Sequence, residues 1–245
     1  MYEYVKRCSS VIHTQTPDYI IMIRLKFYLK VLTGLPKSLY INLKYFGPSG
    51  WRLPIIVTWR TRLTEVKGSV LIKGRLSFGI LRLGFSSVAL SSFHEWNVWN
   101  VNGQLEINGR VDFGSGSKLF IGPHGSLVLG DNVLITACSE IICDHCINVE
   151  KDALISWNVL LMDTDAHPIR DHNNNIINPN RQITVGENVW IGCRTVVLKG
   201  AEIAKNSIVA ANSTVNKIFT ENNVVIGGAP AKIIKRDIVW KREHF

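Results

Sequence analysis

The sequence predicts an all-β protein: a parallel β-helix built from six-residue repeats, with one long extruded loop and a short, partly helical N-terminal extension. Two observations predict this fold. From residue 185 an aliphatic residue opens each of the hexads VGENVW, IGCRTV, VLKGAE, IAKNSI, VAANST and VNKIFT. From residue 129 the same period runs through LGDNVL, ITACSE, IICDHC, INVEKD, ALISWN and VLLMDT. Such a unit is too short for a helix pair, but three units close one triangular coil of short strands.

The composition of the hexads agrees with stacked coils. The opening residue points inward and stacks on its equivalents at the strand spacing of about 4.8 Å. The fifth position is small or β-branched, as in Val189, Thr195, Ala201, Ser207 and Ser213. Gly, Asn and Asp recur at the corners because they tolerate left-handed backbone angles. Weaker hexads (VKGSVL, IKGRLS, LEINGR) extend the repeat back to about residue 66. We therefore expect an extension over 1–65, the β-helix domain over 66–236 and a tail over 237–245.

The N-terminal extension contains the most apolar run of the chain, YIIMIRLKFYLKVL at residues 19–32. Arg24, Lys26 and Lys30 interrupt it, and it is shorter than the roughly 20 residues that a membrane-spanning helix needs. It also lacks the cleavage pattern of a signal peptide. The run predicts an amphipathic helix that packs on the main domain, and it leaves open a peripheral contact with a membrane.

Positive charge is concentrated at the ends of the chain, whose net charge is +9. Residues 1–82 hold 14 Lys/Arg against 3 Asp/Glu, whereas residues 83–163 hold 3 against 9. Basic segments attract anionic lipid, phosphorylated small molecules or nucleic acid. Because the sequence has no helix-turn-helix, zinc-finger or RNA-binding motif, we expect no nucleic-acid partner.

Five cysteines, an odd number without a secretory signal, predict reduced thiols and a cytoplasmic location, with the basic N-terminal segment allowing a position at the inner face of the membrane. Cys138, Cys143, His145 and Cys146 lie close together in the sequence. A second ligand pair at zinc-finger spacing is absent, so we expect small side chains in tight turns and no metal.

The hexad period breaks after VLLMDT and resumes at Val185, so we expect an extruded loop over about residues 163–184. Pro168, Pro179 and the asparagines at 173–175 disfavour a helix or a strand inside it. A long loop on a rigid repeat scaffold is typical of a functional site. Its His167 is a candidate general base, because imidazole titrates near neutral pH and can take a proton from a hydroxyl.

The segments LISWNVLLMDTDAHPI, VGENVWIGCRTVVLKG and VIGGAPAKIIKR resemble the hexapeptide-repeat acyltransferases, in the branch of maltose, galactoside and capsular-polysaccharide O-acetyltransferases. The resemblance covers about residues 66–236. It implies a left-handed β-helix, a homotrimer and transfer of an acetyl group from acetyl-CoA to a sugar hydroxyl in capsular or surface polysaccharide synthesis. In these enzymes a histidine followed by proline on the loop is the general base, and that position here is His167.

Residues close to the loop in the sequence are candidates to bind the acceptor. Asp163 and Asp165 would orient the imidazole or bind sugar hydroxyls, and the sequence does not separate these roles. Asn158 is an acceptor contact or a turn residue, and Trp190 walls the acceptor site or covers the coil. The galactoside-type enzymes place an asparagine where this chain has Cys138, which favours a different acceptor and leaves loss of activity open.

Acetyl-CoA would lie in a groove between neighbouring subunits. By motif position its pantetheine arm would contact Cys193 and Ala211. The cations of Lys217, Lys232 and Lys235 would lie near its nucleotide and phosphates. Each of these residues also fits a plain structural role, the first two in hexad packing and the lysines in a solvated basic tail.

Three alternatives remain open. Similar chemistry would acetylate the amine of an amino sugar. A non-catalytic trimeric scaffold would keep the coils and bind a partner through residues 1–65. A metal enzyme on the same scaffold would use His167 and His172 with His145 or His124, although the first pair lies beside prolines rather than on strands.

Overall fold

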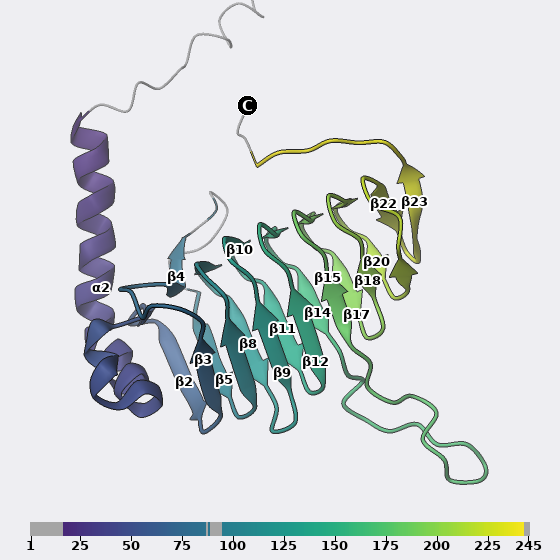
Figure 1. The fold of residues 1–245 in the computed structure, drawn as a ribbon, viewed down its shortest axis with the longest axis horizontal. Helices are drawn as coiled ribbons and strands as arrows, with labels where there is room; N and C mark the ends of the chain where they lie inside the picture. Colours follow the sequence, from purple (N-terminus) through teal and green to yellow (C-terminus); the bar gives the residue numbers. More distant parts are fainter. Residues whose placement is uncertain (1–16, 87, 89–94, 243–245) are drawn as a thin grey trace, which may run out of the picture.

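The computed structural model describes residues 17–86, 88 and 95–242, which form a parallel β-helix with one α-helix across its N-terminal end (Figure 1). Cys8 and the rest of residues 1–16 lie outside the described residues, as do the last three residues of the expected tail. Three sheets form the faces of a prism, and each strand from β1 to β19 pairs in parallel with the strand three positions further along the chain. This arrangement confirms the predicted triangular coils.

Three sheets, named here A, B and C, contain every strand of the described residues. Sheet A consists of β1 (Ile55–Val57), β4 (Leu81–Ser86), β7 (Val111–Gly114), β10 (Val133–Ile135), β13 (Leu154–Ile155), β16 (Trp190–Ile191), β19 (Ile208–Val209), β22 (Val225–Gly228) and β23 (Ala231–Lys235). Sheet B consists of β2 (Thr61–Val66), β5 (Asn97–Val101), β8 (Lys118–Ile121), β11 (Glu140–Cys143), β14 (Leu160–Met162), β17 (Val196–Leu198) and β20 (Thr214–Val215). Sheet C consists of β3 (Ser69–Ile72), β6 (Gln104–Ile107), β9 (Ser126–Leu129), β12 (Cys146–Val149), β15 (Ile183–Val185), β18 (Glu202–Ile203) and β21 (Ile218–Phe219).

The hexads owe their composition to a narrow core. Every hexad opener from Leu129 to Val215 is at most 1% exposed. In the hexads from residue 185 the fifth position also points inward. Its hydroxyls find backbone partners: Thr195 Oγ1 and Ser213 Oγ both donate to the carbonyl of Ala210, at 3.2 and 2.7 Å. Two inward residues per prism face leave room for only one large side chain, which explains the small residue at the fifth position.

The corners between sheets use left-handed backbone conformations. Asn158, Asn188, Asn206 and Asn212 have φ between 53° and 58°, and Cys138 adopts the same conformation with φ of 57°. Asparagine tolerates these angles better than most residues. For Asn158 this geometry agrees with its interpretation as a turn residue.

The coils begin at Ile55, earlier than the expected boundary near residue 66, because the first strand carries no hexad signal. All three residues of β1 are buried, and helix α2 (Pro17–Phe46) covers the open edge of this strand. Asn42 donates to the carbonyl of Ile55 at 2.6 Å and accepts from its N–H at 3.0 Å. Ser38 Oγ accepts from the N–H of Val57 at 3.0 Å. These bonds satisfy backbone groups that an exposed sheet edge would leave unpaired.

A 3₁₀ helix, η1 (Gly47–Arg52), connects α2 to the first coil. Within the described residues, no helix has the length and apolar character needed to cross a membrane.

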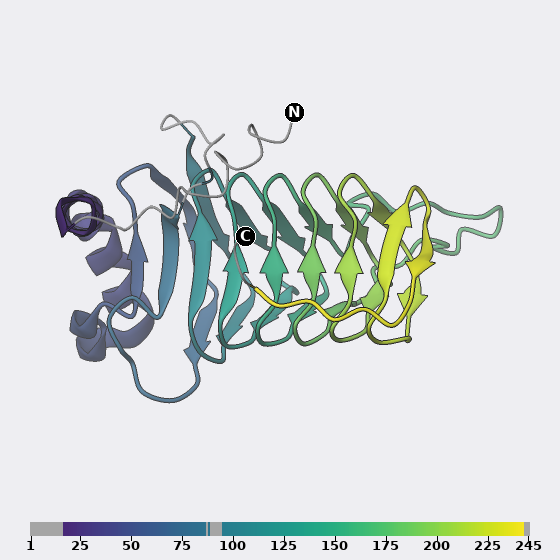
Figure 2. The ribbon, with the colours of Figure 1, turned by 90° about the horizontal axis from the view of Figure 1, so that it is seen from above.

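The C-terminal tail runs back along the prism. After β23, which pairs antiparallel with β22, the chain returns over the corner between sheets C and A (Figure 2). Trp240 Nε1 donates to the carbonyl of Asn188 at 2.8 Å, and the Arg242 guanidinium donates to the carbonyls of Asn132, Asp152 and Ala153. Trp240 and Arg242 therefore attach the tail to the prism.

Replacing one inward residue tests the role of the aliphatic columns. Ile203→Ala should lower the free energy of unfolding by about 2–5 kcal/mol, because it leaves a cavity in a close-packed core. Glu202→Ala, the exposed neighbour on the same strand, should change it by less than about 0.5 kcal/mol. Unfolding in urea measures both. Equal effects of the two variants would contradict the assigned inward register.

Candidate active site

The extruded loop leaves the prism between β14 and β15, at the corner between sheets B and C, named here the B–C corner (Figure 1). It extends as an irregular hairpin: Ile177 donates its N–H to the carbonyl of Ile169 at 2.9 Å, and Arg170 and Ile176 form an isolated antiparallel bridge. The Asp171 carboxylate closes the tip by accepting the N–H groups of Asn173 and Asn175. The loop therefore has more internal structure than its prolines and asparagines predict.

Asp163 anchors the first residue of the loop to the neighbouring coil. Its carboxylate accepts the backbone N–H groups of Asp144 and His145 at 2.8 and 2.9 Å, and its side chain is fully buried. The carboxylate therefore closes the preceding B–C turn. In the structure the partners of Asp163 are these backbone N–H groups, and in the part of the chain that the structure describes the carboxylate makes no hydrogen bond with the imidazole.

Asp165, Asn178 and Lys199 form a hydrogen-bonded group, named here the loop clasp. Lys199 Nζ donates to Asp165 Oδ2 at 2.5 Å and to the carbonyl of Asn178 at 2.8 Å. Asn178 Nδ2 also donates to Asp165 Oδ2, at 2.8 Å. These hydrogen bonds hold the pKa of Asp165 below its ordinary value, with Lys199 as the largest cause. The clasp ties both limbs of the loop to the coil that follows it.

His167 lies directly on the clasp. Its N–H donates to the carbonyl of Asp165 at 2.7 Å, and its carbonyl accepts from Asn178 Nδ2 at 2.9 Å. The N–H of Ile169 donates to Asn178 Oδ1, so the backbone is fixed on both sides of the histidine. The imidazole itself is exposed, and within the described residues neither Asp163 nor Asp165 hydrogen-bonds to it.

A pocket of about 360 Å³ opens beside His167. Ten residues line it: Asp144, Thr164, Asp165, Ala166, His167, Pro168, Ile176, Asn178, Pro179 and Asn180. The pocket therefore combines one imidazole and two carboxylates with the apolar rings of two prolines. Such a site can accept a hydroxyl-bearing ligand and present its hydroxyl to a base.

The other predicted binding residues fall on a different corner. Asn158, Cys193 and Ala211 all lie between sheets A and B, at what we name the A–B corner. Cys193 and Ala211 lie on adjacent coils, where the N–H of Asn212 donates to the carbonyl of Cys193 at 2.9 Å. Strand β17, with three residues, separates the two corners within one coil, a span of roughly 10 Å. One chain therefore presents two halves of the predicted site on two separate corners.

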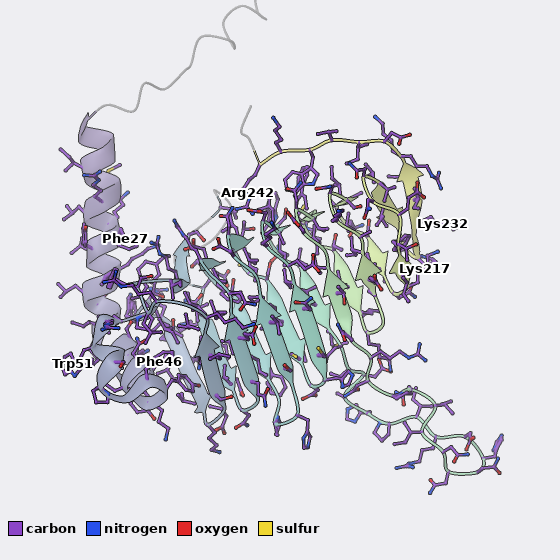
Figure 3. The ribbon with its side chains drawn as sticks, viewed as in Figure 1. Phe27, Phe46, Trp51, Lys217, Lys232 and Arg242 are labelled. Atoms are coloured by element: carbon purple, nitrogen blue, oxygen red, sulfur yellow. The ribbon has the colours of Figure 1, made fainter. Side chains whose placement is uncertain are left out.

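The three predicted phosphate-binding lysines lie beyond the loop, toward the C-terminal end of the prism. Lys217 is at the B–C corner, two coils after the loop, and its Nζ lies 5.3 Å from the ring centroid of Phe219. Lys232 and Lys235 lie on β23, and Figure 3 places Lys217 and Lys232 on the same end of the molecule. The chain thus has a basic end on the side of the prism toward which the loop projects.

Trp190 covers a coil and does not line the loop pocket. Its Nε1 donates to Ser156 Oγ at 3.0 Å, and its ring packs on Trp240 of the tail at a centroid distance of 5.9 Å. Its position on sheet A thus agrees with the covering role that the sequence left open.

The four described cysteines are free thiols. Burial raises the pKa of the Cys138 thiol, and burial together with the Asp163 carboxylate raises that of Cys143. Among the residues that the structure describes, no three His, Cys, Asp or Glu side chains are grouped so that they could hold a metal ion.

Asn178 and Lys199, which hold the loop in place, are not predicted by the sequence motifs. The pairing of β14 with β17 makes Lys199 the equivalent of Asp163 on the next coil, since Met162 lies opposite Leu198. Aligning the hexads before and after the loop would have placed a lysine beside the loop aspartates. Surface lysines are common, so the residue type alone gives no such signal.

Known proteins resemble this chain in sequence and in fold. Residues 182–217 match the family model described as bacterial transferase hexapeptide (six repeats). The polysialic acid O-acetyltransferase of Escherichia coli O1:K1 / APEC is 30% identical over 56% of this chain and 42% of its own length. The putative acetyltransferase DDB_G0275913 of Dictyostelium discoideum is 34% identical over 50% of this chain and 68% of its own length.

A crystal structure of the polySia specific acetyltransferase NeuO superposes with a TM-score of 0.51, at 21% identity, over 78% of this chain and 79% of that one. The chain belongs to the hexapeptide-repeat acyltransferases, and its fold is their left-handed parallel β-helix. It spans between 42% and 63% of the length of the first curated relatives that it matches.

Removing the cation of the clasp should loosen the loop. In Lys199→Met the pKa of Asp165 should rise toward its ordinary value, 3.8, and loop amides should exchange faster. In the wild type the clasp is complete at and above that pH and is lost only as the pH falls through the lowered pKa. A carbon-detected NMR titration of the Asp165 carboxyl measures the shift. Lys217→Met, on a neighbouring coil, is the control, and an Asp165 titration unchanged in Lys199→Met would contradict the clasp.

Proposed function

We propose that the protein is an acetyl-CoA-dependent O-acetyltransferase that acts on a sugar hydroxyl in capsular or surface polysaccharide synthesis, with His167 as general base. The observation that carries this proposal is the placement of His167: an exposed imidazole, on a backbone fixed by the clasp, beside a pocket of about 360 Å³. Membership of the hexapeptide-repeat acyltransferases supplies the reaction class, and the polysialic acid O-acetyltransferase of E. coli suggests a glycan acceptor.

The proposed reaction is direct transfer. The neutral imidazole of His167 takes the proton of the acceptor hydroxyl while the oxygen attacks the thioester carbonyl of acetyl-CoA. Backbone N–H groups stabilise the oxyanion of the tetrahedral intermediate. Its collapse expels the thiolate of coenzyme A, which takes the proton back from the imidazolium. The proton returns to the leaving group, so the histidine ends in its starting state.

We propose that the site is completed between subunits of a homotrimer. Within one chain, His167 and Lys217 lie at the B–C corner, whereas Cys193 and Ala211 lie at the A–B corner. A cyclic assembly places one surface of each subunit against a different surface of the next, which can bring the two corners together. Three isoleucines on the loop support such a contact, because each is more than half exposed in the single chain: Ile169, Ile176 and Ile177.

We place the reaction in the cytoplasm, because free thiols fit a reducing compartment. The lysines at the C-terminal end of the prism would neutralise the phosphates of the donor, as the family resemblance implies for Lys217, Lys232 and Lys235.

Replacing the proposed base gives the direct test. His167→Ala should lower the rate of acetyl transfer by about 10²–10⁴-fold and leave acetyl-CoA binding intact. His172→Ala removes the other histidine of the same loop and should leave the rate unchanged. Release of free coenzyme A and the product mass, measured with a panel of nucleotide-linked sugars and oligosaccharides, report the rate and the acceptor.

The same assay separates the alternatives. A product acetylated on nitrogen would establish an N-acetyltransferase instead. No binding of acetyl-CoA by calorimetry would favour a non-catalytic scaffold, and full activity of His167→Ala would eliminate the proposed base.

A further inference from the structure

Helix α2 is apolar on two sides, and only one side is covered. On the inward side Ile41 and Ser38 are buried, and Phe27 packs on Phe85 at a centroid distance of 5.3 Å. Figure 1 shows the helix lying across the end of the prism, at a steep angle to the stack of coils. The contacts of this inward side account for the attachment of the helix, so they give no reason for apolar residues on the outer side.

The outer side nevertheless carries a continuous apolar stripe. Its main residues recur at intervals of four and three: Ile21, Leu25, Tyr28, Leu32 and Leu35, which are 36–65% exposed. Met22 and Leu29 widen it. Residues at such intervals lie on one face of a helix, and a contiguous apolar patch on this scale marks a binding surface. We name these seven residues the outer stripe.

Basic residues border the outer stripe on both sides. Arg24 precedes Tyr28 by four residues, and Lys26 follows Met22 by four, so the two cations flank the stripe. Both side chains are exposed. From residue 19 to residue 64 the sequence contains eight Lys/Arg and no Asp or Glu. A second copy of this surface would bring like charges together, whereas an anionic lipid surface would complement them.

An aromatic residue extends the same side of the molecule. Trp51, at the end of η1, is 68% exposed, and in Figure 3 it points away from the coils while Phe27 lies on the side of α2 that faces them. Tryptophan is enriched at the boundary between lipid and water, where its ring is partly buried and its N–H stays hydrated.

We propose that the outer stripe and Trp51 dock on an anionic lipid surface, with α2 lying in the plane of the interface and Arg24 and Lys26 at the level of the headgroups. Apolar burial supplies the insertion, and the basic borders select for negative lipid. This surface goes beyond acetyl transfer and would function whether or not His167 is the base. It would hold the chain at a membrane without any spanning helix.

The test uses the full chain and sedimentation with vesicles. Wild-type protein should bind vesicles of phosphatidylcholine with about 30% phosphatidylserine, bind pure phosphatidylcholine weakly, and lose binding as salt is raised. Leu25→Glu with Leu32→Glu should weaken binding at least about tenfold. Leu71→Glu alters a leucine of similar exposure on β3 and should bind like the wild type.

Light scattering and a transfer assay on a free acceptor without vesicles complete the test. The double variant should keep the mass and the transfer rate of the wild type, which separates this inference from the proposed function. Absence of wild-type binding to anionic vesicles would overturn the inference, as would an equal loss in Leu71→Glu. A change of oligomeric mass in the double variant without vesicle binding would assign the outer stripe to a contact between copies instead.

Discussion

The structure depends on the burial of two inward side chains per hexad inside a prism that closes at left-handed corners. Because each coil pairs its backbone with the next and stacks Ile, Val and Leu in columns, no coil can shift without exposing its neighbours. This constraint produces a rigid scaffold of uniform pitch. The ends of the stack need separate covers, which α2 provides for β1 and the hairpin of β22 and β23 provides at the other end.

The rigid coils fix the position of the loop. A loop of about twenty residues would not hold a side chain in place by itself, but two anchors attach this loop to the prism. Asp163 binds the turn of the preceding coil, and Lys199 on the following coil binds Asp165 and Asn178. The clasp holds the backbone of His167 from both sides. A segment whose prolines and asparagines disfavour helix and strand can therefore still hold the proposed base in place.

Sequence periodicity predicted the parts of the fold that repeat. The hexads located the coils, their inward residues and the loop, since each depends on local pattern. Periodicity did not predict that β1 and β2 begin the first coil. All three residues of β1 are buried, so this strand lacks the alternation of inward and outward residues. Periodicity also does not predict side-chain contacts between neighbouring coils or with the tail. Examples are the Asp163 carboxylate that accepts backbone N–H groups, Lys199 beside Asp165, and Trp190 packed on Trp240. These depend on register across the loop and on the path of the tail.

We propose above that one catalytic site is shared by the B–C corner of one subunit and the A–B corner of the next. The most direct measurement is complementation between two inactive variants, His167→Ala and Ala211→Trp, the second of which blocks the exposed A–B corner. In a mixed trimer assembled at random from equal amounts, about one interface in four joins two intact corners, so about a quarter of wild-type activity should return. No recovery in verified mixed trimers would contradict the account, because it would place both halves of the site in a single chain.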